Sequence, residues 1–377
     1  MTAFQREASL RRGLADSTDR LYLRPLGLLE GEAAEAAIAA GIAIPLAGAA
    51  RAFSLVDLYL RKSDGRIVAL SATPAQLRDW AAGEGLTEKV EAWFARLSMP
   101  RPDFGGLAMD RPQIMGVVNV TPDSFSDGGD FLDPDRAVRQ ARALADAGAS
   151  ILDIGGESTR PGSAEVPADE EQARVVPVIR ALAETGAAIS IDSRRASVMA
   201  AALEAGAGIV NDVTALTGDS GSLDLVAARQ APTILMHMRG TPQTMQNDPD
   251  YRFAPLDIYD YLEARVEACL AAGLPLSHIA IDPGIGFGKT IRHNLELLSH
   301  LALFHGLGCP VLLGVSRKGF IGKLSRGEEP KRRVPGSLAA ALEGVRQGVQ
   351  MIRVHDVDET RQAFAIAQGI AGQGIAG

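Results

Sequence analysis

The chain of 377 residues is long enough for two domains, or for one large barrel with a smaller unit attached. Hydrophobic residues make up 46% of it, enough for a sizeable core, and no apolar run reaches the roughly 18 residues of a membrane span. The formal net charge of −8 argues against a nucleic-acid-binding protein, because such proteins normally carry a basic surface.

The N-terminal segment and the cysteines indicate the compartment. The first twenty residues have no apolar core region, so they do not predict a secretory signal. Cys269 and Cys309 show no metal-ligand spacing and are interpreted as packing thiols. We therefore expect a cytoplasmic protein, in a reducing compartment, without a membrane partner.

The first part of the chain predicts a small α+β unit without a chemical motif. The stretch 98–112 is rich in Pro and Gly and is interpreted as a linker. The predicted domains are therefore residues 1–108, of unknown role, and residues 109–377. Within the first, we expect helices near 32–40, 74–83 and 86–97 and strands over 53–61 and 65–71.

From residue 113 onward a pattern repeats. A short run rich in Ile, Val and Leu ends in small or polar residues, and a helical segment follows. Strands buried on both faces have nearly continuous apolar sequences, as these do. Helices are expected at 135–148, 169–185 and 294–306, and strands at 113–121, 150–155, 188–192, 208–212, 233–237, 279–283, 311–316 and 351–355.

Eight strand–helix units are typical of a (β/α)₈ barrel, which takes roughly 250 residues. The alternative is an open doubly wound sheet. The barrel is favoured by the number of strands and because no GxGxxG turn follows the first strand. The predicted fold class is α/β, a (β/α)₈ TIM barrel with a small N-terminal α+β domain.

Barrel enzymes place their active sites at the C-terminal ends of the strands. The second predicted strand ends in Gly155 and Gly156, followed by the polar run from Glu157 to Arg160. Seven of the eight predicted strands end in polar residues, which predicts a ligand site at this face rather than a set of unrelated strand caps. The polar residues at the other strand ends are Asn119, Thr121, Asp192, Asn211, Asp212, His237, Asp282, Ser316, Arg317, Lys318, Arg353 and His355.

The stretch DPGIGFGKT (282–290) ends like a phosphate-binding loop. A Walker A loop needs glycine at the position occupied here by Pro283, and it follows the first strand of a nucleotide fold rather than the sixth of a barrel. The ATP interpretation is therefore rejected. The glycines instead predict a tight turn over a flat ligand.

The strand-end side chains suit a heterocycle. A 2-amino-4-oxo-pyrimidine ring offers N–H donors, which carboxylates accept, and acceptor atoms, which Asn and Lys serve. Asp192, Asn211, Asp282 and Lys318 together match such an edge. A site built on these pairs rejects analogues that lack them, because its buried polar groups would be left unpaired.

Five stretches carry a resemblance: MGVVNVTPDSFSDGG (115–129), GGESTRPGS (155–163), DPGIGFGKT (282–290), GVSRKGFIG (314–322) and MIRVHDV (351–357). They closely resemble the dihydropteroate synthase family, over about residues 112–371. In that family para-aminobenzoate displaces pyrophosphate from 6-hydroxymethyl-7,8-dihydropterin pyrophosphate, with Mg²⁺ present, to give 7,8-dihydropteroate for folate biosynthesis. The resemblance implies these two small-molecule substrates, a homodimer, and sulfonamides as competitors.

The resemblance also implies roles for single residues. Asp123 and Asp127, in the first loop motif, are expected to organise the metal or to stabilise a cation, and both alternatives stay open. Asp192, Asn211, Asp282, Lys318 and Arg353 are expected to hold the pterin; Ser158, Thr159, Arg160, Pro161, Phe287, Ser316 and Lys318 the para-aminobenzoate; Arg353, His355 and Asn119 the pyrophosphate; and Asn119 the Mg²⁺.

The chemistry favours a dissociative route. An aromatic amine is a weak nucleophile, so pyrophosphate departure must do most of the work, and the electron-rich dihydropterin can carry positive charge on its exocyclic methylene. Groups that stabilise the departing pyrophosphate are then the main catalysts. The expected catalytic residues are Asn119, Asp123, Asp127, Lys318, Arg353 and His355.

The sequence gives the remaining histidines weaker roles, and two other functions compete with the synthase. His237 is expected either to anchor a loop or to contact a ligand, and His278, His293, His300 and His305 are expected to be ordinary surface or helix residues. One alternative function is a methyltetrahydrofolate–corrinoid methyltransferase on the same kind of barrel. The other is a non-catalytic pterin-binding scaffold acting through the N-terminal unit. The STRPGS, SRK and RVH motifs argue against both.

Overall fold

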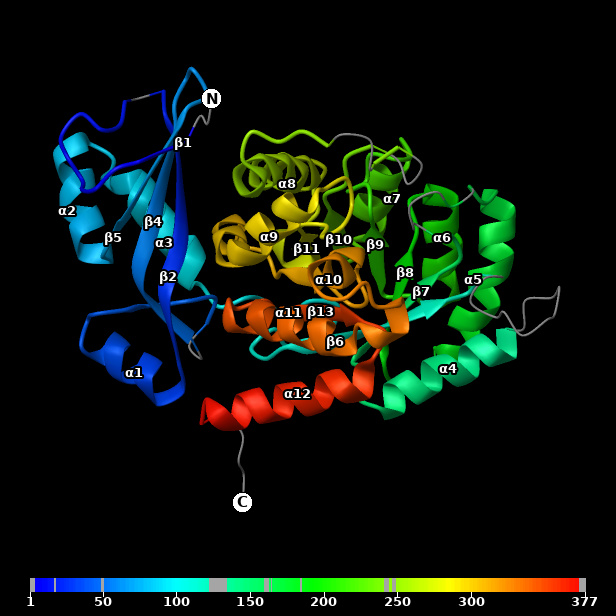
Figure 1. Ribbon diagram of the computed structural model, residues 1–377. Coiled ribbons are helices and arrows are strands. Elements are labelled where there is room, and N and C mark those ends of the chain that lie inside the picture. The colour runs from blue at the N-terminus through cyan, green and yellow to red at the C-terminus, as the bar shows by residue number, and fades with distance from the viewer. Residues whose placement is uncertain are drawn as a thin grey trace.

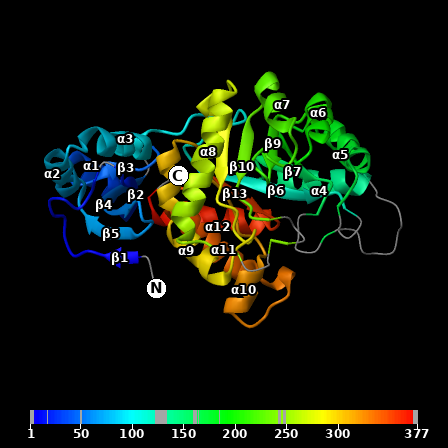
Figure 2. The ribbon, with the colours of Figure 1, turned by 90° about the horizontal axis from the view of Figure 1, so that it is seen from above.

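The computed structural model describes residues 4–16, 18–48, 51–121, 134–158, 163, 165–183, 185–240, 244–245 and 249–372. A barrel with helices around it forms the larger part, and a smaller unit built on a second sheet lies beside it (Figures 1 and 2). Among the described residues, no helix is both long enough and apolar enough to cross a membrane.

Eight parallel strands make the barrel, in the order β11-β10-β9-β8-β7-β6-β13-β12. A parallel bridge between Ile281 and Val311 joins the two end strands and closes the sheet. The prediction of a (β/α)₈ barrel is confirmed. The strands are β6 (Gln113–Asn119), β7 (Ile151–Gly155), β8 (Ala188–Asp192), β9 (Ile209–Asp212), β10 (Thr233–Met236), β11 (Ile279–Asp282), β12 (Leu312–Gly314) and β13 (Met351–Val354).

Helices follow the strands and cover the outside of the barrel. They are α4 (Pro134–Asp146), α5 (Ala168–Leu182), α6 (Ala196–Ala205), α7 (Ser222–Arg229), α8 (Ala254–Ala271), η2 (Leu276–His278), α9 (Ile291–Ser299), η3 (Leu301–Leu307), α10 (Gly319–Leu324), η4 (Pro330–Arg332), α11 (Val334–Arg346) and α12 (Val357–Ile370).

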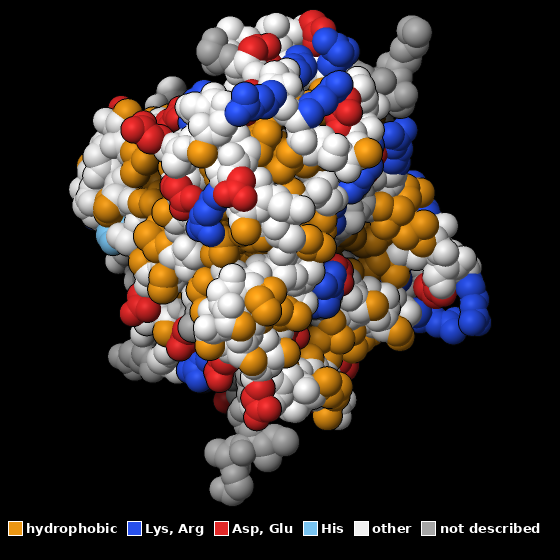
Figure 3. Space-filling model, turned by 90° about the vertical axis from the view of Figure 1, so that its left-hand side faces the viewer, with side chains coloured by type: hydrophobic (Ala, Val, Ile, Leu, Met, Phe, Trp, Pro, Cys, Tyr) orange, Lys and Arg blue, Asp and Glu red, His pale blue; other side chains and the backbone are white. Residues whose placement is uncertain are grey.

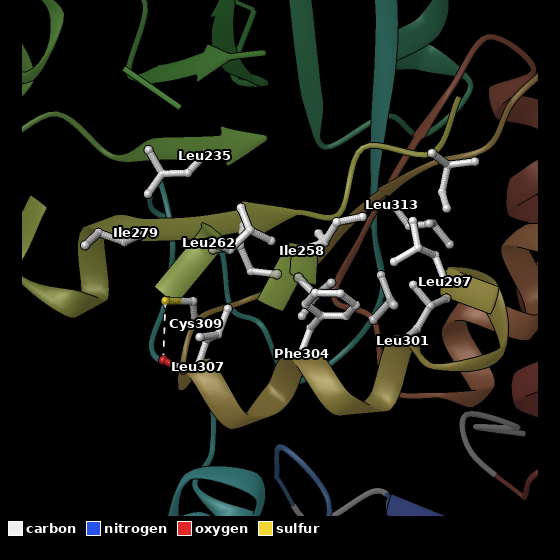
Figure 4. Packing of buried hydrophobic residues seen from close by; sticks show 14 of the residues in the cluster. Leu235, Ile258, Leu262, Ile279, Leu297, Leu301, Phe304, Leu307, Cys309 and Leu313 are labelled. Carbon is white, nitrogen blue, oxygen red and sulfur yellow. Dashed lines mark hydrogen bonds between the residues drawn. The ribbon is translucent and has the colours of Figure 1, made fainter. Parts of the chain in front are cut away.

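The helix expected over 294–306 is two elements, α9 and η3. His300 separates them because its backbone leaves the helical region, at φ −121° and ψ 19°, while its ring Nδ1 bonds the carbonyl oxygen of Glu296. The turn directs Leu301, Phe304 and Leu307 of η3 toward the barrel strands (Figure 4). Cys309 is buried here with its sulfur 3.7 Å from the carbonyl oxygen of Leu307, and Cys269 is also buried and free, as expected for packing thiols.

The far end of the barrel, opposite the strand C-termini, is closed by the segment predicted as a linker. Phe104 is fully buried in a cluster with inward-facing residues such as Met115, Ile151 and Ile209. Gly105 has φ +58°, and a Cβ there would lie 2.5 Å from the Ile209 side chain, so the close approach needs glycine. The barrel is therefore plugged at this end, and the strand C-termini lie at the other.

The N-terminal unit (residues 4–98) is a mixed sheet with helices. Its order is β1-β5-β4-β2, with β3 also paired to β4; β1 runs parallel to β5 and the other pairs are antiparallel. Its elements are β1 (Phe4–Arg6), β2 (Arg20–Glu30), α1 (Gly31–Ala39), β3 (Ile44–Pro45), β4 (Arg51–Arg61), β5 (Ile67–Ala72), α2 (Pro74–Glu84) and α3 (Thr87–Ser98).

This unit shares its core with the barrel. Tyr22 and Trp93 pack on Tyr259 of α8, with ring centroids 5.6 and 5.3 Å away. One cluster of buried apolar residues runs from Leu14 to Phe364 without a break at the predicted boundary near residue 108, which itself stays a prediction. Toward solvent the unit carries interspersed basic, acidic and apolar side chains (Figure 3).

Candidate active site

Strand register brings the predicted pterin residues to one rim. Asn119 pairs with Gly155, Gly155 with Asp192, and Asp192 with Asn211, so four neighbouring strands end at one level. Inward-facing residues alternate along a strand with outward-facing ones, which places these side chains at the mouth of the barrel. On the other side Gly314 pairs with Arg353, and Met236 with Asp282.

Arg353 is the centre of this rim. Its Nη2 donates to Asp192 Oδ2 over 2.8 Å, and its Nε donates to Asp153 Oδ2 over 2.6 Å. Asp153 also accepts from Asn211 Nδ2 over 3.2 Å. Burial lowers the pKa of Arg353, but Asp153 and Asp192 more than reverse this and hold it above its usual value. The guanidinium therefore stays charged and balances two buried carboxylates.

Asp153 was missed by the sequence analysis. It lies in the middle of β7 with no exposed surface, and its Oδ1 is buried without a hydrogen bond from the described residues. The available signal was an Asp inside the otherwise apolar strand sequence ILDIG. A carboxylate in such a place needs a partner from another strand, because an unpaired buried charge is costly.

The two carboxylates at the mouth, Asp192 and Asp282, have raised pKa values. Burial and the neighbouring Asp153 raise the pKa of Asp192 to about 7, against the pull of Arg353. Burial also raises the pKa of Asp282 to about 6, although the backbone N–H of Gly284 donates to it over 2.7 Å. Shifts of this kind are common where a ligand is to supply the missing donors.

Lys318 follows β12, the neighbour of the strand β11 that carries Asp282. Burial lowers its pKa to about 8, with Asp282 acting in the opposite direction. Its Nζ lies 4.2 Å from the centre of the Phe287 ring, a cation–π contact. A Cβ added to Gly286 would lie 3.3 Å from Lys318 Cδ, so the glycine turn and Lys318 are in close contact.

The SRK turn that presents Lys318 is held in an uncommon conformation. Arg317 has φ +58°, in the left-handed region that a side chain rarely adopts. Its backbone N–H donates to Ser337 Oγ over 2.9 Å, and its Nε donates to Asp356 Oδ2 over 3.0 Å. These bonds offset the strain, which is a pattern found at functional sites.

Ser316 and His355 meet at the ends of β12 and β13. The hydroxyl oxygen of Ser316 accepts from the backbone N–H of His355 over 3.1 Å and lies 3.0 Å from its Nδ1. The residues expected for para-aminobenzoate and for pyrophosphate are thus adjacent here. Ser158 is half-buried in the loop that follows β7, and Asn119 is half-buried at the end of β6. Asp123, Asp127, Thr159, Arg160 and Pro161 lie outside the described residues.

The last two residues of the DPGIGFGKT turn, Lys289 and Thr290, make structural contacts. Lys289 is only 3% exposed, and its Nζ lies 3.0 Å from His237 Nδ1, 3.3 Å from the carbonyl oxygen of His237 and 2.9 Å from that of Phe287. Thr290 caps α9, accepting from the backbone N–H of His293. Neither residue is free to bind a phosphate, in agreement with the rejection of an ATP loop.

The structure shows which of its two predicted roles His237 has, and it gives the surroundings of His305 and His300. His237 is a packed anchor for Lys289, and burial lowers its pKa well below the usual value. His305 lies in the helix η3, in agreement with the prediction of a surface or helix residue, but it is fully buried, with Nε2 donating to the carbonyl oxygen of Gln347 over 2.9 Å. His300 is half-buried, and the ring of Tyr59 from the N-terminal unit lies 6.0 Å from its ring.

Comparison with known proteins identifies the family. A family model described as pterin binding enzyme matches residues 115–355. The dihydropteroate synthase of Escherichia coli strain K12 is 43% identical over 263 residues, which cover 70% of this chain and 93% of that protein. The dihydropteroate synthase of Neisseria meningitidis serogroup B is 47% identical over 271 residues, covering 70% of this chain and 94% of that one.

Solved structures agree. The Xanthomonas albilineans dihydropteroate synthase with 4-aminobenzoic acid aligns with a TM-score of 0.68 and 46% identity, covering 72% of this chain and 98% of that one. The Yersinia pestis enzyme in complex with a sulfonamide drug aligns with a TM-score of 0.67 and 44% identity, covering 71% and 96%. The geometry of the mouth and these matches lead to one conclusion: the chain belongs to the dihydropteroate synthase family of pterin-binding enzymes.

Proposed function

We infer that this chain catalyses the reaction of its family, the condensation of para-aminobenzoate with 6-hydroxymethyl-7,8-dihydropterin pyrophosphate to 7,8-dihydropteroate in folate biosynthesis. The observation that carries the residue assignment is the rim on which Asp192, Asn211 and Asp282 face Lys318 and Arg353. It offers acceptors and donors in the pattern that a pterin edge requires.

The pterin is proposed to lie across this rim. Asp192 and Asp282 accept from the ring N–H and amino groups, while Asn211 and Lys318 serve its acceptor atoms. Gly155 and Gly314 present no side chain at this rim; a Cβ on Gly155 would be in ordinary contact with Asp192 Cβ, 3.6 Å away, and one on Gly314 would lie 4.0 Å from Asp282 Oδ2. Donors from the ligand replace those that the buried carboxylates lack, so binding favours their ionised forms.

Reaction begins when the C–O bond between the pterin methylene and pyrophosphate breaks, and the electron pair leaves with the pyrophosphate. Arg353 and His355 stabilise that leaving group at the mouth. The para-aminobenzoate nitrogen then forms the new C–N bond, and its extra proton passes to solvent. The side chain of Arg353 is 23% exposed, so its guanidinium can reach a ligand while it holds the two aspartates.

Asn119 fits the role of a magnesium ligand. Its amide is half-buried at the mouth, and its side chain makes no hydrogen bond within the described part of the chain, so its oxygen is open. Mg²⁺ prefers oxygen ligands and usually takes only one or two from the protein, the others being phosphate and water. A bound Mg²⁺ supplies neutralisation of pyrophosphate charge. Asp123 and Asp127 remain candidates for the same task.

Para-aminobenzoate is proposed to bind beside the pterin, against Phe287, Ser316 and Lys318, with Ser158, Thr159, Arg160 and Pro161 from the second loop. The ring of Phe287 already packs under Lys318 Nζ, which leaves a cationic and aromatic wall for a benzoate. Sulfonamides share this shape and compete there. The homodimer and the cytoplasmic location stay predictions.

The test follows pyrophosphate release and dihydropteroate formation together, with purified protein, dihydropterin pyrophosphate and Mg²⁺, with and without para-aminobenzoate. Coupled formation of both products supports the assignment. Pterin binding without turnover would instead support a scaffold or a methyltransferase.

A further inference from the structure

The N-terminal unit lies before residue 115, where the family match begins, so the family reaction gives it no role. Besides its aromatic contact with Tyr259 of α8, the unit meets the barrel at Arg252 and Phe253, which with Tyr251 directly precede α8. Residues 251–253 are called here the docking segment. We propose that the N-terminal unit positions the docking segment and, through it, the glycine turn of the pterin site. This inference rests on the proposed function and extends it.

Aromatic packing makes the first contact. Phe4 of β1 and Tyr59 of β4 both pack against Phe253, with ring centroids 5.5 and 5.9 Å away. Phe253 also meets the ring of His300 at 5.3 Å, edge to face, so the rings of Tyr59, Phe253 and His300 are in mutual contact. The Tyr59 hydroxyl lies 3.0 Å from His300 Nε2. Since His300 Nδ1 lies 2.7 Å from the carbonyl oxygen of Glu296, Nδ1 carries the proton and Nε2 is an acceptor, which faces both the Tyr59 hydroxyl and Arg24 Nη1.

An ion-pair relay makes the second contact. Arg61, at the end of β4, donates to Asp257 Oδ1 over 2.7 Å and to Asp260 Oδ2 over 2.5 Å. The other oxygen of Asp257 accepts from the backbone N–H groups of Arg252 and Phe253, over 2.8 and 3.2 Å. Arg61 therefore fixes the carboxylate that fixes the docking segment. These side chains are only 20–25% exposed, so solvent screens the pairs less than it screens surface pairs.

A close approach makes the third contact. Gly65, in the turn between β4 and β5, is buried and has φ +82°. A Cβ at this position would lie 1.3 Å from Arg252 Nη1, so the turn and the arginine touch. The neighbouring turn residues Ser63, Asp64 and Arg66 are exposed, as is usual for a hairpin turn, so Gly65 is the part of the turn that Arg252 covers.

The docking segment continues into the site through Tyr251. Its hydroxyl donates to the carbonyl oxygen of Gly288 over 2.8 Å. Gly284, Gly286 and Gly288 all have positive φ, so this turn depends on outside bonds to hold one shape. The residue between the last two, Phe287, carries the Lys318 cation–π contact. Tyr251 is thus the positioning residue that joins the N-terminal unit to the pterin turn.

The experiment compares two variants and their combination in the full chain. Arg61→Met removes the ion pairs but keeps an apolar stem, and Tyr251→Phe removes only the bond to Gly288. Each is expected to raise KM for dihydropterin pyrophosphate by about threefold to tenfold, in the range for coupling through packed networks, with kcat changed less than twofold. The double variant should raise KM by less than the product of the two, because both act on one link.

Controls separate positioning from general stability. Arg78→Met makes the same charge change in the N-terminal unit, where Arg78 pairs with Glu91 at 46% exposure of each side chain, and it should leave KM unchanged. Arg61→Lys retains a cation for one aspartate and should recover part of the affinity. Hydrogen exchange in Arg61→Met should quicken in peptides covering 249–257 and 282–290.

The outcomes distinguish the two hypotheses. If the unmodified chain makes no dihydropteroate, the proposed function fails. If it does, and Arg61→Met lowers the melting temperature without changing the pterin KM or the exchange of 282–290, the positioning role is overturned while the function stands. Multiplicative effects in the double variant would likewise overturn a shared link.

Discussion

Arg353 Nη2 donates to Asp192 Oδ2 over 2.8 Å, although the two residues are 161 positions apart in the chain. The pair crosses the mouth of the barrel from β13 to β8, and the guanidinium of Arg353 balances the charge of the Asp192 carboxylate.

Replacing Arg353 with Met is expected to lower kcat/KM by about two to three orders of magnitude, the usual cost of losing one preorganised donor to a developing anion. The same change leaves Asp153 and Asp192 without their shared cation. Steady-state kinetics of the coupled reaction measures the effect. Arg346→Met, on the outside of α11, is the matched control and should change kcat/KM less than twofold. Equal effects of the two variants would contradict the assignment.

Pterin affinity should depend on pH near neutrality. The pKa of Asp192 is about 7 and that of Asp282 about 6, against an ordinary 3.8. Because the ionised carboxylates accept the pterin N–H groups, Kd should rise as the pH falls through these values. Calorimetry in two buffers of different ionisation enthalpy should detect proton release on binding. A Kd that stays constant across this range would rule the assignment out.

The raised pKa values of Asp192 and Asp282 also make the free energy of unfolding depend on pH. The unfolded chain loses these two protons near pH 4, and the folded chain only near pH 6 and 7. The folded state binds more protons within that window, so the contribution of both groups to the free energy of unfolding falls as the pH rises through it. Asp192→Asn should remove the upper part of this dependence in denaturant titrations.

Asp153→Asn tests the residue that the sequence analysis missed. The amide cannot balance the guanidinium of Arg353, and hydrogen bonds to charged groups contribute about 1.5–3 kcal/mol. We expect kcat/KM to fall by about tenfold to a hundredfold. Asp358→Asn makes the same charge change on the exposed first turn of α12 and should have little effect.

Lys289→Met should lower the free energy of unfolding by about 1–3 kcal/mol, since it leaves buried carbonyl oxygens without a donor. Chemical denaturation measures this, with Lys323→Met as the exposed control. The unmodified protein should show no ATP binding by calorimetry. Measurable ATP binding that Lys289→Met abolishes would restore the phosphate-loop interpretation.

Sulfonamides should raise the apparent KM for para-aminobenzoate without changing kcat. The benzoate and the drug are proposed to share the wall of Phe287 and Lys318. Initial rates at several concentrations of each compound test this. Inhibition that changes kcat alone would place the drug elsewhere.

The sequence analysis predicted the barrel and most of its rim because both follow from local patterns. Apolar runs mark the strands, and a polar residue after each run marks the mouth, as for Asp192 and Asp282. Asp153 was not predicted because a polar residue inside an apolar strand sequence does not indicate which other strand supplies its partner. The partner, Arg353, is 200 positions away.

The contacts of the N-terminal unit could not be predicted for a related reason. The sequence alone does not reveal that Tyr59 meets His300 or that Arg61 meets Asp257, since nothing local requires these pairs. The break at His300 and the buried state of His305 likewise depend on packing between distant elements. The sequence analysis therefore assigned no role to a unit whose importance lies in its contacts.

The shared core also bears on how the chain folds during synthesis. The N-terminal unit leaves the ribosome before the barrel, yet the rings of Tyr22 and Trp93 pack on Tyr259 of α8, more than 150 residues later. Contacts so distant in sequence form slowly, and until then an aromatic surface stays open to association. Early chains should therefore depend on chaperones, and completion of α8 should mark the point at which the nascent N-terminal unit becomes resistant to protease.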